Sequence, residues 1–216
     1  MFSISYTKKL SDAKQNGRYI CFRERYGKEE NLGVFNDKTD NANIHKFNKD
    51  LEDKKTQHPS VAVAHKMLFS MSGDEWNRSG FEPGDFQTLV RNVMKDYEQQ
   101  TGKRLTWIAA EHRTPGHPHV HVLVKSVYHD KDGVPYRLKF DKDDSNFLKN
   151  SFQREKNYLR GFEVERPDKT HEYKPTRNHG KRATNDITKS LLNHVLNEMR
   201  QAEREMERER QNERDR

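Results

Sequence analysis

The sequence has a single cysteine, Cys21, among its 216 residues. One thiol cannot form an intramolecular disulfide, and it cannot supply the several cysteines of a structural zinc site. No hydrophobic run reaches the roughly 20 residues that span a bilayer, and residues 1–20 lack the apolar core of a signal peptide. These absences exclude disulfide-stapled and membrane-spanning classes, and they predict a cytoplasmic protein with no membrane partner.

Hydrophobic residues are also scarce, at 31%, whereas charged residues make up 35% and give a net charge of +7. The terminal stretch "RQAEREMERERQNERDR" balances six arginines against six acidic residues, so the excess positive charge lies before it. A basic chain of this kind favours a polyanionic partner, and nucleic acid fits better than a membrane surface.

Apolar periodicity and turn residues predict an α+β fold with a central antiparallel sheet of about five strands and helices packed on one face. The predicted strands are 1–6, 59–73, 104–112, 117–128 and 130–140. The predicted helices are 11–30, 43–54, 82–102 and 143–162. We expect one domain over residues 1–165. Residues 166–216 then form a basic loop and a charged C-terminal helical extension, the start of a longer C-terminal region.

The stretch "EHRTPGHPHVHVLVKS", residues 111–126, holds four histidines within ten positions. His117, His119 and His121 alternate, so on a strand their side chains share one face while the intervening valines share the other. His112 ends the preceding predicted strand, and the "RTPG" turn returns the chain to the same place. We therefore expect four imidazoles on the open face of the sheet.

Imidazole is the commonest metal ligand among protein side chains. A set of three histidines leaves coordination positions open, which is typical of catalytic and not of structural metal sites. The alternative is a surface cluster of histidines without a ligand, which four histidines on two adjoining strands disfavour.

The segment "HRTPGHPHVHVLV" resembles the three-histidine motif of HUH relaxases, the enzymes that nick one DNA strand in plasmid mobilisation and conjugation. The segment "LKFDKDDSNFLKNSFQREKNYLRGF" is similar to the helix that follows that motif. The resemblance implies a divalent metal, Mn²⁺ or Mg²⁺, held by His112, His119 and His121, with His117 as the alternative ligand. The family often has an acid in the turn, which "RTPG" lacks, and Glu111 should point away from His112.

The resemblance also implies a tyrosine nucleophile on the N-terminal helix, which attacks a phosphodiester and remains on the 5′-phosphate. Tyr19 and Tyr26 are the candidates, and we favour Tyr26. The related "Y-x-x-R" pattern coincides here with Phe22-Arg23-Glu24-Arg25, so phenylalanine occupies the expected nucleophile position. A change from tyrosine at position 22, made to inactivate the enzyme, is the alternative to a nucleophile at Tyr19 or Tyr26.

The implied partner is single-stranded DNA at a transfer origin, together with relaxosome accessory or coupling proteins. Basic residues near the histidine face should contact phosphates, and binding would then depend on salt. The candidates are Lys125, Arg137, Lys139, Arg177, Lys181 and Arg182. Tyr136 could stack on bases, whereas Trp107 fits the core better.

Three other functions compete with this interpretation. A rolling-circle replication initiator shares the metal chemistry but places its tyrosine after the histidines, where Tyr158 lies in "YLRG" without the usual lysine. A non-catalytic metal- and DNA-binding protein would need a fourth protein ligand to close the site. A metal hydrolase lacks both an H-E-x-x-H motif and a clearly placed carboxylate base.

Overall fold

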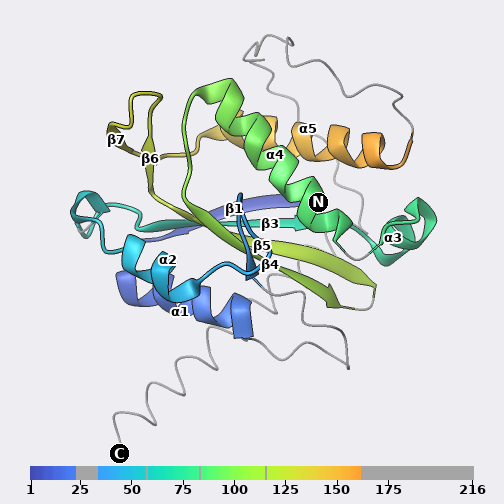
Figure 1. Cartoon of the computed structure of the whole chain (residues 1–216), viewed down its shortest axis with the longest axis horizontal. Coiled ribbons are helices and arrows are strands. Elements are labelled where there is room, and N and C mark those ends of the chain that lie inside the picture. The colour runs from blue at the N-terminus through green and yellow to red at the C-terminus, as the bar shows by residue number, and fades with distance from the viewer. Residues whose placement is uncertain (23–33, 57, 83, 115, 162–216) are drawn as a thin grey trace, which may run out of the picture. The chain divides into compact units, whose positions relative to one another are not determined.

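A computed structural model describes residues 1–22, 34–56, 58–82, 84–114 and 116–161 of the chain (Figure 1). Its strands are β1 (Phe2–Thr7), β2 (Val34–Phe35), β3 (Ala64–Ser70), β4 (Trp107–Thr114), β5 (His117–Lys125), β6 (Val127–His129) and β7 (Pro135–Arg137). Its α-helices are α1 (Leu10–Phe22), α2 (Ile44–Asp50), α3 (Gly73–Ser79), α4 (Asp85–Thr101) and α5 (Lys142–Leu159). The predicted extension over 166–216 lies outside the described residues.

The central sheet has five strands in the order β1-β3-β5-β4-β2, and every neighbouring pair is antiparallel. β4 and β5 form the predicted hairpin, in which His112 pairs with His119 and Ala110 with His121. β6 and β7 form a separate two-stranded ribbon that follows β5. The predicted α+β class with an antiparallel sheet of five strands is confirmed.

One face of the sheet carries the larger core, beneath α4 and α5 (Figure 1). Val120, Val122 and Val124 of β5 are buried there, as their alternation with the histidines predicts. Phe86 of α4 and Phe152 of α5 stack with ring centres 6.1 Å apart above them. Each such side chain contributes about 1.5–3 kcal/mol when fully buried, so this face holds the helices firmly to the sheet.

The opposite face also carries helices, which differs from the prediction that helices cover one face only. α1 and α2 pack against Ile108 and Leu123, apolar residues on the same face as the histidines. The close approach depends on Gly17 of α1, where an added Cβ would lie 3.0 Å from Cδ1 of Ile44 and 3.5 Å from Cδ2 of Leu123. The inward residues of α1 are thus small, Ala13 and Gly17, followed by Ile20.

Two other elements depart from the predictions. Residues 130–140 do not add a strand to the central sheet, because β7 pairs with β6. The fifth strand is instead β2, two residues between the predicted helices 11–30 and 43–54, which pairs with Ala109 and Ala110 of β4. α3 was not predicted, although Ser72 caps it by accepting a hydrogen bond from the backbone amide of Glu75.

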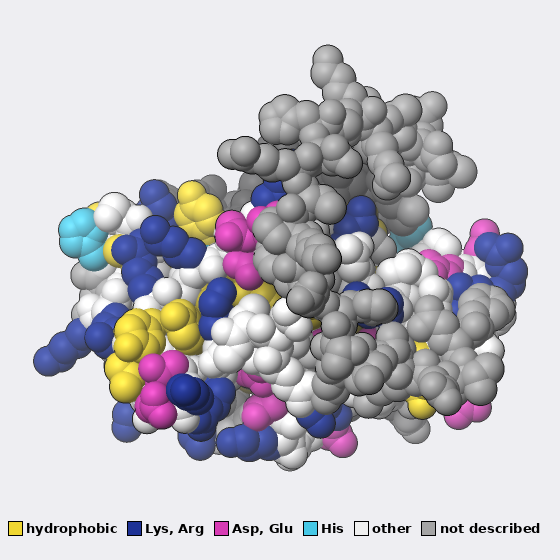
Figure 2. All heavy atoms as spheres, turned by 90° about the horizontal axis from the view of Figure 1, so that it is seen from above, with side chains coloured by type: hydrophobic (Ala, Val, Ile, Leu, Met, Phe, Trp, Pro, Cys, Tyr) yellow, Lys and Arg dark blue, Asp and Glu magenta, His cyan; other side chains and the backbone are white. Residues whose placement is uncertain are grey.

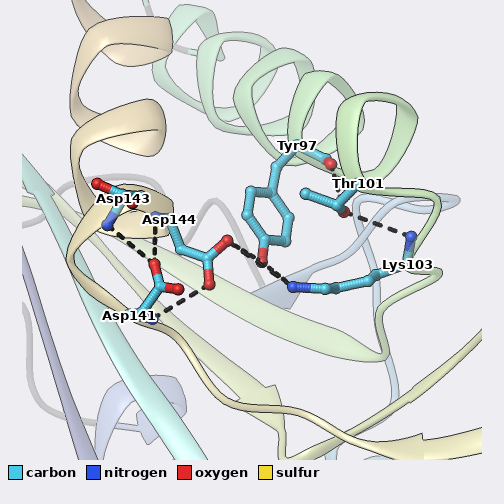
Figure 3. Close-up of polar contacts among 6 residues, drawn as sticks. All are labelled: Tyr97, Thr101, Lys103, Asp141, Asp143 and Asp144. Carbon is cyan, nitrogen blue, oxygen red and sulfur yellow. Dashed lines mark hydrogen bonds and ion pairs between the residues drawn. The ribbon is translucent and has the colours of Figure 1, made fainter. Parts of the chain in front are cut away.

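Polar contacts join α4 to α5 near the ribbon (Figure 3). The Tyr97 hydroxyl donates to Asp144 at 2.9 Å and accepts from the Lys103 ammonium at 3.1 Å. Asp144 and Asp141 form a capping box at the start of α5. This network fixes the end of the molecule that carries β6 and β7. None of the helices in the described ranges is long and apolar enough to cross a bilayer.

Candidate functional site

Three histidines gather on the sheet face shared with α1. In the β4–β5 hairpin His112 lies directly opposite His119, and His121 follows on the same face of β5. The ring centres are 5.2 Å apart for His112 and His119, 5.3 Å for His112 and His121, and 5.0 Å for His119 and His121. His112 and His119 are buried, and His121 is half-buried. The predicted trio is therefore brought together.

Two of these rings are oriented by backbone carbonyls. Nε2 of His112 lies 3.0 Å from the Ile20 carbonyl oxygen, and Nδ1 of His119 lies 2.8 Å from the His117 carbonyl oxygen. A carbonyl can only accept, so each of these ring nitrogens carries the proton. The lone pair is then on Nδ1 of His112 and on Nε2 of His119. Metal-bound histidines are commonly oriented in this way by a carbonyl behind the ring.

The donor set fits a metal ion in number and in kind. Imidazoles bound at about 2.1 Å to one ion have ring centres about 5 Å apart, as these have. The rings of His112 and His119 are stacked at 6°, however, and parallel stacked rings do not aim two lone pairs at one point. Within the described ranges no three His, Cys, Asp or Glu side chains stand ready to hold an ion. Binding therefore requires at least one of the stacked rings to turn.

His117 lies at the start of β5 on the same face, opposite Thr114 and farther toward the turn than the other three. Its side chain is half-buried, and its carbonyl orients the ring of His119. Glu111, as predicted, points away from the histidines: it is 1% exposed on the other face and forms an ion pair with Arg113 at 3.0 Å.

The last turn of α1 adjoins the histidines through the contact between Ile20 and His112. Tyr19 lies in that turn, half-buried against the smaller core. Phe22 is the last residue of α1, and Tyr26 lies outside the described residues. The segment with the candidate nucleophiles thus begins beside the histidine cluster. Tyr158, the candidate of the competing initiator function, is on α5, the helix that covers the valine face.

The structure places Lys125, one of the predicted DNA contacts, inside the fold. Lys125 is only 8% exposed, and its ammonium pairs with Asp53 at 2.9 Å. It is also six residues from His119 along β5, about 20 Å at the rise of a strand. The carboxylate of Asp53 holds the cation inside the fold.

The other predicted DNA contacts fall into two groups. Arg137 ends β7, and Lys139 follows it. Both therefore lie at the ribbon, whereas the sequence predicted them beside the histidines. Arg177, Lys181 and Arg182 lie outside the described residues. Trp107 is 3% exposed and packs edge-on against Phe35, which places it in the core.

Two features of the site were missed from the sequence. Lys66 and Ser70 of β3 share the histidine face, because their neighbour Leu68 pairs with His121. Gly73 at the start of α3 donates to the Gly116 carbonyl at 2.7 Å, and an added Cβ would lie 2.7 Å from Cα of Gly116. This contact supports the β4–β5 turn. Only the strand pairing reveals the first feature, whereas the S-x-x-E pattern of Ser72 and Glu75 signals α3.

No protein-family model matches the sequence, and no curated protein matches it. Several solved structures, however, do match the chain. The chain is similar to the conjugative relaxase TrwC in complex with oriT DNA in a copper-bound structure, with a TM-score of 0.52 and 13% identity over 74% of this chain and 69% of that chain. The chain has the fold of a conjugative relaxase.

A second similar structure is TrwC complexed with a 27-mer DNA comprising the recognition hairpin and the cleavage site. Its TM-score is 0.50, with 16% identity over 74% of this chain and 68% of that chain. The resemblance suggested by the histidine motif is thus confirmed for the relaxase fold, which these neighbours share with the described chain.

Proposed function

We propose that this chain is a DNA relaxase that nicks one strand at a transfer origin to initiate conjugative transfer or mobilisation. The observation that carries the proposal is the trio His112, His119 and His121 on adjoining strands of a relaxase fold, beside the last turn of the tyrosine-bearing α1. Its substrate is single-stranded DNA. Relaxosome accessory or coupling proteins are further partners, and plasmid DNA places the reaction in the cytoplasm.

The metal would be a divalent cation, Mn²⁺ or Mg²⁺, held by His112, His119 and His121, with His117 as the alternative ligand. When bound, it withdraws charge from the scissile phosphate and orients it. The carbonyl of Ile20 keeps a proton on Nε2 of His112, and the carbonyl of His117 keeps one on Nδ1 of His119. The other nitrogen of each ring then offers its lone pair to the metal.

The nucleophile would be a tyrosine of the α1 segment, with Tyr26 favoured over Tyr19. Its phenolic oxygen forms a bond to phosphorus as the bond from phosphorus to the 3′-oxygen breaks. The phenolic proton leaves the nucleophile, and the departing oxygen gains a proton to become a 3′-hydroxyl. No water is consumed, so the 3′-hydroxyl can attack the phosphotyrosine and reseal the strand.

The experiment compares the protein with its Phe22→Tyr variant on a single strand that spans the transfer origin of the parent element. Each is incubated with Mn²⁺ or with EDTA, and denaturing gels and mass spectrometry locate any adduct. We expect a metal-dependent adduct on Tyr26. An adduct that appears only after Phe22→Tyr would assign the nucleophile to position 22. Cleavage by neither protein would contradict the proposed function, and an adduct on Tyr158 would favour a rolling-circle initiator.

A further inference from the structure

The exposed large hydrophobic side chains of the described ranges gather at the end of the molecule remote from the histidines. They are Tyr6, Val134 and Tyr136, with exposed fractions of 59%, 45% and 46%. Tyr6 is near the end of edge strand β1, and Tyr136 is the central residue of β7. Their collection at one end makes that end a candidate binding surface, to be judged by what surrounds them.

A series of ring contacts connects the two exposed tyrosines through the core. The ring of Tyr6 lies 6.4 Å from that of His65, whose ring lies 5.0 Å from Phe140. Phe140 lies 5.4 Å from Tyr97. The series continues through the Lys103 ammonium, 5.5 Å from the Tyr97 ring and 5.9 Å from that of Tyr128.

Tyr128 completes the series, because it stacks on Tyr136 across the ribbon at 5.7 Å. The hydroxyl of Tyr97 and the ammonium of Lys103 are themselves fixed by Asp144 (Figure 3). Tyr6 therefore rests on the buried ring of His65, and Tyr136 rests on the half-buried ring of Tyr128. Rigid rings lose little conformational entropy when a planar group stacks on them.

Positive charge surrounds these rings. The Lys8 ammonium lies 5.9 Å from the Tyr6 ring, and Lys131, Arg137 and Lys139 are exposed on the ribbon and beside it. Figure 2 shows Lys and Arg side chains beside hydrophobic ones toward the left, the end at which Figure 1 places β6 and β7.

Two of the acidic residues at this end are engaged with the backbone. Asp130 accepts from the amides of Asp132 and Val134, and Asp141 caps α5. Exposed aromatic faces flanked by cations match the chemistry of single-stranded nucleic acid, whose bases stack and whose phosphates pair with Lys and Arg. A duplex keeps its base faces covered, so it would leave the tyrosine rings unused.

We infer that Tyr6, Tyr136 and the neighbouring Lys8, Arg137 and Lys139 form a second single-strand-binding platform, separate from the histidine site. The platform depends on the proposed function only because that function identifies its ligand as DNA. The histidines are near the start of β5, whereas the ribbon follows its end, about 20 Å farther along the strand. The platform would hold sequence that flanks the cleaved segment, without base-specific readout.

The test measures binding of oligothymidine of about 30 nucleotides, long enough to exceed the site size of a single-strand-binding module, in EDTA. Loss of one stacked base should weaken binding about tenfold in Tyr6→Ala and in Tyr136→Ala. Tyr136→Phe keeps the ring and should retain the affinity. Arg137→Ala with Lys139→Ala should lower the salt slope by about 0.7 for each phosphate that the variant no longer binds. Lys95→Ala, an exposed charge on α4, is the matched control.

Crosslinking with 5-iodouracil in the same oligonucleotide should label peptides that contain Tyr6 or Tyr136. Unchanged affinity in both alanine variants would overturn the platform. So would equal competition by a duplex of the same length, which would show a surface that reads phosphates alone. The binding result holds whether or not the proteins cleave DNA, so the two proposals fail separately.

Discussion

At the scale of single residues, metal binding depends on which ring nitrogen each histidine offers. The carbonyls of Ile20 and His117 settle that for His112 and His119, because a carbonyl oxygen accepts and never donates. Alternation on a strand predicted that the histidines share a face, and the resemblance to relaxases implied the trio. Neither could predict these carbonyl partners, which arise from the approach of α1 and from the local backbone of β5.

Replacing one of the three predicted metal ligands should lower cleavage activity more than replacing His117 does. We expect His119→Ala and His121→Ala to lower Mn²⁺-dependent cleavage by at least about 100-fold, since loss of an outer-shell partner alone costs 10–100-fold. His117→Ala should have a smaller effect, because its carbonyl remains. Single-turnover cleavage and calorimetric titration with Mn²⁺ measure the two consequences. Equal losses in all three variants would indicate a ligand set that includes His117.

A tyrosine replaced by phenylalanine should separate the two candidate nucleophiles. We expect Tyr26→Phe to abolish adduct formation, since it removes the attacking oxygen and keeps the ring. Tyr19→Phe should leave adduct formation within about twofold and folding unchanged, because its half-buried ring packs against the core and is retained. Adduct yield on denaturing gels is the measurement. A reversed pattern would move the nucleophile into α1 itself.

His65 should make the protein less stable in mild acid. Burial lowers the pKa of His65 from 6.5 to about 4, so the unfolded chain binds its proton at higher pH than the folded chain does. This contribution to stability is complete above pH 6.5 and is lost as the pH falls toward 4, by about 2 kcal/mol at pH 5. Urea unfolding at pH 7 and pH 5 measures the change. His65→Gln should flatten that dependence, and an unchanged dependence would contradict the assignment.

At the scale of elements, periodicity predicted the helices and strands whose formation depends mainly on local sequence. α4, α5 and the β4–β5 hairpin follow from apolar stripes and from the "RTPG" turn. β2 could not be predicted, because Val34 and Phe35 form a strand only through pairing with β4. The inward face of α1 is lined by Ala13 and Gly17, small residues that an apolar stripe does not mark. Helix packing, and not propensity, selected that face.

The turn that joins β4 to β5 should be sensitive to bulk in α3. Gly73→Ala would place a Cβ 2.7 Å from Cα of Gly116, a backbone atom that can move only with the turn. We expect a loss of about 1–3 kcal/mol of stability, typical of overpacking, together with weaker cleavage. Asn77→Ala, an exposed change in the same helix, is the control. Urea unfolding that is identical in the two variants would show that the turn adapts freely.

At the scale of the whole molecule, opposite ends of one sheet carry different chemistry. The histidines lie near the start of β5, and the basic ribbon lies beyond its end. Net positive charge predicted a nucleic-acid partner, but it could not show which lysines and arginines lie on which surface of the fold. Lys125 is held inside by Asp53, whereas Arg137 and Lys139 belong to the ribbon. Pairing and burial, which appear only in the folded chain, make that distinction.

Label transfer from a strand carrying ³²P at the scissile phosphate tests the proposed relaxase chemistry in a single step. We predict that the label remains covalently on the protein in Mn²⁺, attached to the fragment on the 3′ side of the nick, with a 3′-hydroxyl on the other fragment. It should disappear in EDTA and in a variant with both His119→Ala and His121→Ala. A label retained by that variant, or cleavage that leaves two DNA fragments and no labelled protein, would contradict the relaxase function.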